Sequence, residues 1–153
     1  MKETDLELFR WNWYRLRVRD IKANRNAALG LRTFWSEYGV FVSTLPRQSG
    51  KSEMIIKMAE ALENDGENFL IIVLNENMKR HLSGMAPNIY PGKIRTNPGA
   101  MMSFYRLGAD SRPEDTHILI DEYEHLHNQA MGWIMNENWK SISLVGSYKL
   151  RAT

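Results

Sequence analysis

The sequence predicts an α/β protein, a three-layer sandwich in which helices cover both faces of a central, mostly parallel five-stranded sheet, preceded by an N-terminal helix. Two observations predict this fold. Short apolar runs alternate along the chain with stretches of helical periodicity, and that order is typical of right-handed crossovers between parallel strands. Most of the apolar runs are also unbroken, as in strands that are buried on both faces.

The first predicted element is a helix over residues 5–28 that ends near Gly30. Thr4 and Glu7 have the spacing of a capping box, in which each side chain satisfies a backbone donor of the other residue. The apolar residues that recur after this cap are Leu6, Phe9, Trp13 and Leu16, extended by Tyr14, Val18 and Ile21. We expect Trp11, Trp13 and Tyr14 to pack in the core rather than to stack on bases.

The rest of the chain supplies the predicted sheet and its covering helices. Strands are expected over residues 39–43, 69–74, 93–96, 117–121 and 142–146. Helices are expected over residues 50–64, 77–83, 99–107 and 124–136. In parallel sheets of this kind ligands bind outside the carboxyl ends of the strands, so a site is expected at that edge.

Length and composition restrict the class of protein. A chain of 153 residues with 43% hydrophobic residues fits one domain that buries about two-thirds of its unfolded surface. The lack of cysteine excludes a disulfide framework, a thiolate zinc site and a cysteine nucleophile. No apolar run approaches the roughly 20 residues of a membrane-spanning helix, and the start does not resemble a signal peptide. We therefore expect a cytoplasmic protein without a membrane partner.

The small net charge of +2 is unevenly distributed along the chain. Residues 1–35 carry eight basic and four acidic side chains, whereas the remainder carries twelve basic and fourteen acidic ones. A basic arm of this kind suits a polyanionic partner and equally suits a solvated helix face. Its candidate contacts to DNA are Arg15, Arg17 and Arg19.

The segment between the first strand and the following helix is the main candidate for a phosphate site. Gly50 lets the backbone approach a phosphate, Lys51 supplies a positive charge, and the Ser52 hydroxyl can bind Mg²⁺. The consensus glycine five residues before Gly50 is replaced by Leu45. The alternative is an ordinary helix start, capped by Ser49 or Ser52.

Two acidic residues end the fourth predicted strand. Three apolar residues bring Asp121 to the carboxyl edge of the sheet, where it can hold Mg²⁺ opposite Ser52. Glu122 follows directly, and a carboxylate beside a γ-phosphate can polarise a water for in-line attack, which favours hydrolysis. The alternative is a pair of exposed acids at the start of a helix. Together with Lys51, the doublet predicts a nucleotide site.

Residues 44–52 resemble the deviant phosphate loop (Walker A motif) of bacteriophage large terminases, the ATP-driven motors that package DNA. That family replaces the first glycine and carries an Arg-Gln pair, here Arg47 and Gln48, ahead of Gly-Lys-Ser. Residues 118–122 resemble its second motif (Walker B). Residues 141–148 resemble the motif that couples hydrolysis to movement, with Ser147, the candidate coupling residue, expected just past the strand.

The resemblance implies a P-loop NTPase of the RecA-like or terminase-like type, with a nucleotide-binding core over residues 38–148 and a basic helical arm over residues 1–35 of a single domain, 1–153. It implies that ATP and Mg²⁺ are the cofactors. The residues expected to bind the nucleotide are Pro46, Arg47, Gln48, Ser49, Gly50, Lys51 and Ser52. Lys51 would contact the phosphates, and Ser52 and Asp121 the metal. Glu122 would be the catalytic acid, and Arg47 would stabilise the transition state.

The resemblance also implies partners. Large terminases carry an RNase H-type nuclease that this chain is not expected to contain. We therefore expect an ATPase that packages double-stranded DNA in the host cytoplasm, acting as a ring or other oligomer together with a separate nuclease or portal-type viral proteins. The other possibility within this lineage is an accessory ATPase. The alternatives are an inactive nucleotide-binding relative, a helicase-like ATPase, and a non-catalytic interaction protein that a nucleotide stabilises.

Overall fold

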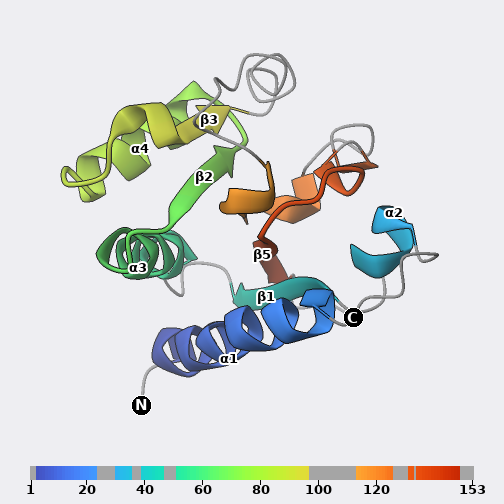
Figure 1. The fold of residues 1–153 in the computed structure, drawn as a ribbon. Helices are drawn as coiled ribbons and strands as arrows, with labels where there is room; N and C mark the ends of the chain where they lie inside the picture. The colour runs from blue at the N-terminus through green and yellow to red at the C-terminus, as the bar shows by residue number, and fades with distance from the viewer. Residues whose placement is uncertain are drawn as a thin grey trace, which may run out of the picture.

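The computed structural model describes residues 3–23, 30–35, 39–46, 51–96, 113–125, 131–132 and 134–148. In chain order its elements are α1 (Glu3–Ala23), α2 (Leu31–Phe34), β1 (Val40–Pro46), α3 (Lys51–Asn64), β2 (Asn68–Val73), α4 (Glu76–Met85), β3 (Ile94–Thr96), β4 (Thr116–Asp121) and β5 (Ser141–Tyr148), with the 3-10 turns η2 (Pro91–Lys93), η4 (Pro113–Asp115) and η5 (Tyr123–His125) (Figure 1). The five strands form one sheet in the order β1-β5-β4-β2-β3.

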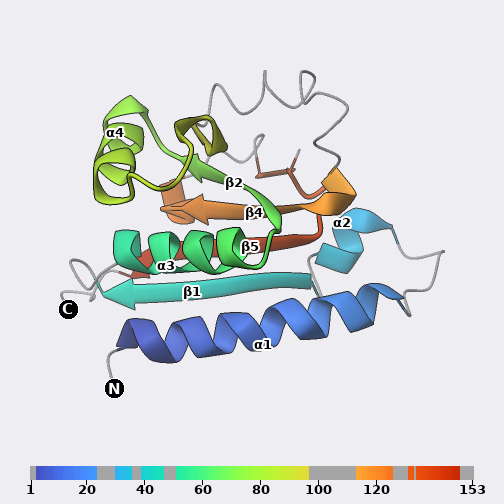
Figure 2. The ribbon, with the colours of Figure 1, turned by 60° about the vertical axis from the view of Figure 1, so that its left-hand side comes forward.

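The predicted sheet is confirmed, because all five expected strands are present and every pairing between them is parallel (Figure 2). The helices predicted over residues 50–64 and 77–83 correspond to α3 and α4. The helix predicted over 99–107 lies outside the described residues. Of the helix predicted over 124–136, the structure describes the two ends: the 3-10 turn η5 and a helical stretch that includes residues 131–132.

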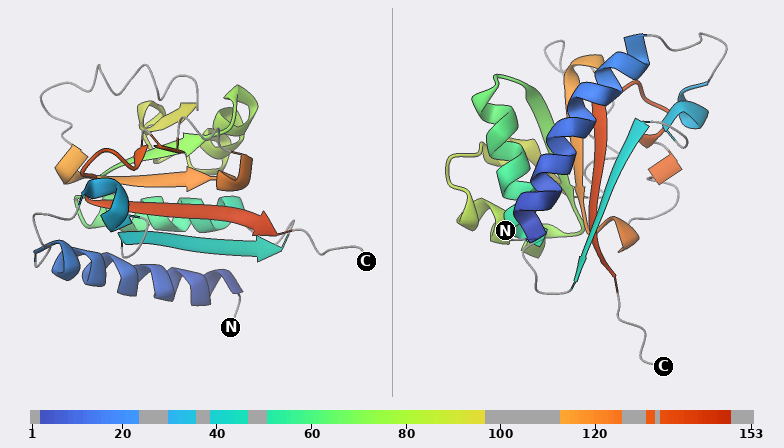
Figure 3. Two further views of the ribbon diagram at one scale, coloured as in Figure 1. Left: turned by 90° about the vertical axis from the view of Figure 1, so that its right-hand side faces the viewer. Right: turned by 90° about the horizontal axis from the view of Figure 1, so that it is seen from below.

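The two faces of the sheet bury alternate residues of each strand, because successive side chains of a strand point to opposite faces. The strand residues that pack against α1, α3 and α4 are Phe41, Leu45, Phe69, Ile71, Val73, Ile94, Leu119 and Val145. The strand residues in the core of the opposite face, which contains α2, are Ile72, Ile118, Ile120, Ile142 and Leu144. Figure 3 shows α3 on one side of the strands and α2 on the other, while α1 runs along the edge of the sheet and contributes Trp11 to the first core and Val18 to the second. The three-layer sandwich is therefore confirmed.

The helix α1 buries a different face from the predicted one. Trp11 is fully buried and Tyr14 packs against the core, as predicted, but Trp13 is 65% exposed, so the prediction that it packs in the core is wrong. Polar contacts fix the rotation of the helix: the Trp11 indole nitrogen donates to Oγ of Ser143 over 2.9 Å, and the Tyr14 hydroxyl donates to the Ile142 carbonyl over 2.9 Å. Burial raises the pKa of Tyr14, which keeps this hydroxyl neutral.

None of the helices in the described part of the chain combines the length and the apolar character that crossing a membrane requires. A cytoplasmic location stays an expectation.

Candidate functional site

Parallel pairing brings the two candidate segments of the sequence to one edge of the sheet. The strands β1 and β4 run in the same direction with β5 between them, so their carboxyl ends lie at the same edge. Lys51 is the first residue of α3, which follows β1 in the chain, and Glu122 directly follows β4. Side chains from both segments can therefore meet above this edge.

Lys51 and Glu122 do meet, although they are 71 positions apart in the sequence. Nζ of Lys51 lies 3.0 Å from Oε1 of Glu122, and the two side chains are 15% and 23% exposed. The first residue of a helix also stands in the partial positive charge of the free backbone N–H groups. The site thus combines an ammonium group, a helix N-terminus and a carboxylate, partly shielded from water.

Asp121 ends β4 and is 3% exposed. Its depth follows from its strand, which is buried along its whole length because β2 and β5 flank it on either side. By strand alternation its side chain lies on the same face as Leu119, which is the face that α3 covers. A carboxylate oxygen is a ligand of the kind that divalent cations such as Mg²⁺ bind.

The backbone at Glu122 adopts an uncommon conformation. Its φ of 52° is the one positive φ at a non-glycine residue in the described ranges. The left-handed conformation costs an L-residue about 1–2 kcal/mol, and strain of this kind clusters at functional sites. A continued strand would send residue 122 to the face opposite Asp121, so the left-handed turn is what directs the Glu122 carboxylate towards Lys51.

The remaining predicted residues of the loop are placed only in part. Pro46 is the last residue of β1, and Ser52 is half-buried in the first turn of α3. The candidate nucleotide-binding residues Arg47, Gln48, Ser49 and Gly50 lie outside the described residues. Ser147 was expected just past its strand, and that expectation is wrong: β5 runs on to Tyr148, because it stays paired with β1 up to Pro46.

No group of three or more histidine, cysteine or acidic side chains that could hold a metal ion occurs among the residues that the structure describes. A nucleotide-bound Mg²⁺ does not require such a group, since phosphate oxygens and water supply most of its ligands. The hydroxyl of Ser52 and the buried carboxylate of Asp121 are oxygen donors of the kind that this ion takes.

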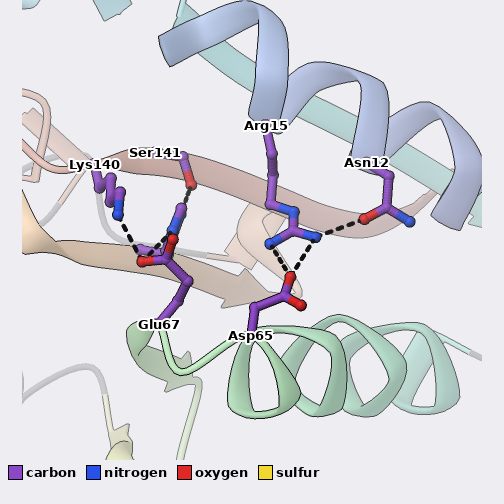
Figure 4. A network of polar contacts seen from close by, with 7 residues as sticks. Asn12, Arg15, Asp65, Glu67, Lys140 and Ser141 are labelled. Carbon is purple, nitrogen blue, oxygen red and sulfur yellow. Dashed lines mark hydrogen bonds and ion pairs between the residues drawn. The ribbon is translucent and has the colours of Figure 1, made fainter.

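The three candidate DNA contacts of the basic arm have different surroundings. Arg15 is engaged within the protein: its guanidinium donates to Asp65 over 3.3 Å and to Asn12 over 2.8 Å (Figure 4), and it lies 4.4 Å from the Trp11 ring. Arg17 and Arg19 are exposed. Asp65 precedes β2, so Arg15 lies near the amino ends of the strands, at the edge opposite Lys51.

Sequence reasoning missed a polar network at that amino edge. Lys140 donates to Glu67 over 2.6 Å (Figure 4), and Nδ1 of the buried His117 lies 2.5 Å from Oγ of Ser141. Burial lowers the pKa of His117 to about 4, and the Lys140 hydrogen bond lowers the pKa of Glu67. No local motif could have identified these residues, because strand register brings them together: His117 pairs with Ser141.

These features define an α/β protein with an all-parallel sheet and a partly shielded lysine–glutamate pair at the carboxyl edge of that sheet. The sequence matches no protein-family model, and no curated protein matches it either. The function is therefore argued from the site.

Proposed function

We propose that this chain binds ATP with Mg²⁺ at the carboxyl edge of the sheet and hydrolyses it, as a terminase-like ATPase that powers movement of double-stranded DNA. The observation that carries the proposal is the 3.0 Å contact between Lys51 and Glu122. It joins the N-terminus of the helix after β1 to the end of β4, which is the arrangement that a triphosphate and a water-activating carboxylate require.

Each residue has a task that its position allows. The α3 N-terminus and Lys51 would neutralise phosphate charge, while Ser52 and Asp121 would hold Mg²⁺, which would offset the remaining charge on the phosphates. An incoming phosphate competes with Glu122 for the Lys51 ammonium group. Nucleotide binding thus releases the Glu122 carboxylate, which can then accept a hydrogen bond from the attacking water.

The strained turn at Glu122 supports a catalytic role over a merely structural ion pair. The left-handed conformation of Glu122 costs about 1–2 kcal/mol, and a glutamate that only stabilised the fold through an ion pair could do so from an ordinary backbone conformation. A strained backbone conformation of this kind is typical of a functional site, where a side chain must be held in one direction.

The test is an ATPase assay of the purified chain with and without Mg²⁺ and double-stranded DNA. Glu122→Gln should retain ATP binding and abolish turnover, because the amide cannot accept a proton; Lys51→Met should lose binding. The matched control is Lys57→Met on the same helix, since the partners of Lys57 are Asp5 and Glu53 outside the site. A wild-type chain that does not bind ATP overturns the proposal. Binding without turnover leaves a non-catalytic nucleotide-binding protein, and normal turnover by Glu122→Gln removes Glu122 from its role.

The proposed action on DNA has its own test. Stimulation of hydrolysis by blunt double-stranded DNA supports a packaging-type motor, and unwinding of a tailed duplex indicates a helicase-like enzyme instead. Arg17→Gln with Arg19→Gln should flatten the dependence of log affinity on log salt by about one unit per lost phosphate contact. Both side chains are exposed, so these changes leave the packing intact. An unchanged slope would show that the basic arm does not contact DNA.

A further inference from the structure

A row of large apolar side chains lies on the exposed face of α1. Leu6, Phe9, Trp13 and Leu16 are 50%, 63%, 65% and 58% exposed, and we call them the α1 stripe. Single exposed apolar residues are normal, but a contiguous row of them marks an interaction surface. Trp11 and Val18 fill the buried face of the same helix. The helix therefore has two apolar faces, and the described residues bury one of them.

The spacing of the α1 stripe identifies the kind of partner. The four residues lie at positions i, i+3, i+7 and i+10, which is the seam of a two-helix coiled-coil contact. The row is also symmetric about residue 11, because Leu6 and Leu16 lie five residues from it and Phe9 and Trp13 lie two. A second α1, antiparallel to the first, places leucine opposite leucine and phenylalanine opposite tryptophan.

The distribution of charge along α1 also favours an antiparallel pair. Apart from Asp20, its acidic residues lie in its first seven positions, while its basic residues run from Arg10 to Lys22. An antiparallel pair sets the acidic end of each helix beside the basic end of the other. A parallel pair would set like charges beside each other, which disfavours it.

A groove beside the α1 stripe can receive the aromatic side chains of a second copy. It lies between α1 and the edge strand β1, has a volume of about 490 Å³, and is lined by residues that include Phe9, Trp13, Val40 and Phe41. In Figure 2 α1 runs along β1 at the outer side of the molecule. Both copies present the same α1 stripe and the same groove, as a two-fold interface requires.

We propose that this chain forms a two-fold symmetric dimer in which the α1 stripes of two copies pack antiparallel. The contact uses the same face on both copies and closes with two subunits. Four side chains per copy make an interface below the standard size of about 1,600 Å², so we expect dissociation at about micromolar concentration. The proposal does not depend on nucleotide binding.

Cysteine cross-linking tests the geometry directly, because the chain contains no cysteine. A mixture of Leu6→Cys and Leu16→Cys chains should form a disulfide-linked dimer under mild oxidation. Neither variant should cross-link with itself, since ten helical residues, about 15 Å, separate like positions across the axis. Self-cross-linking of Leu6→Cys would indicate parallel helices and overturn the proposal, as would a mixture that fails to cross-link at concentrations where the wild type is dimeric.

Sedimentation equilibrium tests the energetic role of the α1 stripe. The double variant Phe9→Ser with Trp13→Ser should raise the dissociation constant at least about tenfold, with an unchanged circular dichroism spectrum because both side chains are exposed. The matched control removes two exposed apolar residues elsewhere, Met85→Ser with Tyr90→Ser, and should leave the constant unchanged. A wild-type chain that stays monomeric to millimolar concentration, or a dimer that survives the double variant, overturns the proposal.

Discussion

The buried His117 makes the stability of this protein sensitive to acid. Its side chain is 6% exposed, and Nε2 lies 3.8 Å from Oε2 of Glu67. Burial lowers the pKa of His117 from its ordinary 6.5 to about 4, because a protonated imidazole would lose its hydration there; the nearby Glu67 carboxylate opposes this effect only in part, and Lys140 adds to it.

The sign and size of the effect follow from proton binding. Below about pH 6.5 the unfolded chain binds a proton on this imidazole, whereas the folded chain does not until about pH 4. The free energy of unfolding therefore falls as the pH falls through this window, by about 3 kcal/mol in total at 1.36 kcal/mol per pKa unit. The pKa of Glu67 is lowered from 4.5, so its stabilising contribution is lost only at lower pH.

Urea unfolding measured from neutral pH down to about pH 4.5 checks this prediction. His117→Gln should remove most of the loss of stability over this window, because the amide does not titrate. The exposed His81 provides the control, and His81→Gln should leave the pH dependence as it is in the wild type. An unchanged pH dependence in His117→Gln, or an imidazole of His117 that titrates near pH 6.5 by NMR, would refute the reasoning.

Three other substitutions have expected effects on the free energy of unfolding, each measured by urea titration. Glu122→Gly should be more stable than Glu122→Ala by about 1 kcal/mol, because alanine keeps the strain of the positive φ; equal stability would contradict that strain. Trp11→Phe should lose about 1–3 kcal/mol by leaving the buried Ser143 hydroxyl without its indole donor, and no loss would show that the bond is not needed. Leu62→Ala should cost about 2–5 kcal/mol in the core, whereas the exposed Met85→Ala should cost much less, and equal losses would contradict this difference in burial.

The fold could be predicted from local patterns, whereas the rotation of α1 could not. Unbroken apolar runs identify the strands because those strands are buried on both faces. On α1, both the buried row that contains Trp11 and Val18 and the exposed α1 stripe have helical spacing, so periodicity alone cannot choose between them. The choice is made by hydrogen bonds from Trp11 and Tyr14 to β5, more than 100 residues later in the chain.

The candidate site shows the same division between local and long-range information. That Lys51 and Glu122 share an edge follows from the direction of parallel strands, so the sequence was sufficient to predict it. The left-handed turn at Glu122 depends on the path that the chain takes beyond β4, and residue 122 is not a glycine or asparagine that would predict it. The His117 network depends on the register between β4 and β5, which the apolar pattern of the strands does not encode.

If the site binds ATP as proposed, the position of β5 leaves room for a phosphate and a water at once. Because β5 lies between β1 and β4, two strand spacings, about 10 Å, separate the ends of those strands. If β1 and β4 were neighbours, that separation would be half as large, and the two side chains would fill it. Lys51 and Glu122 instead reach across the wider gap from opposite sides. Under the proposed function, a phosphate that draws the lysine away from the glutamate would leave room between them, and the carboxylate would face the phosphate across a space that a water could enter.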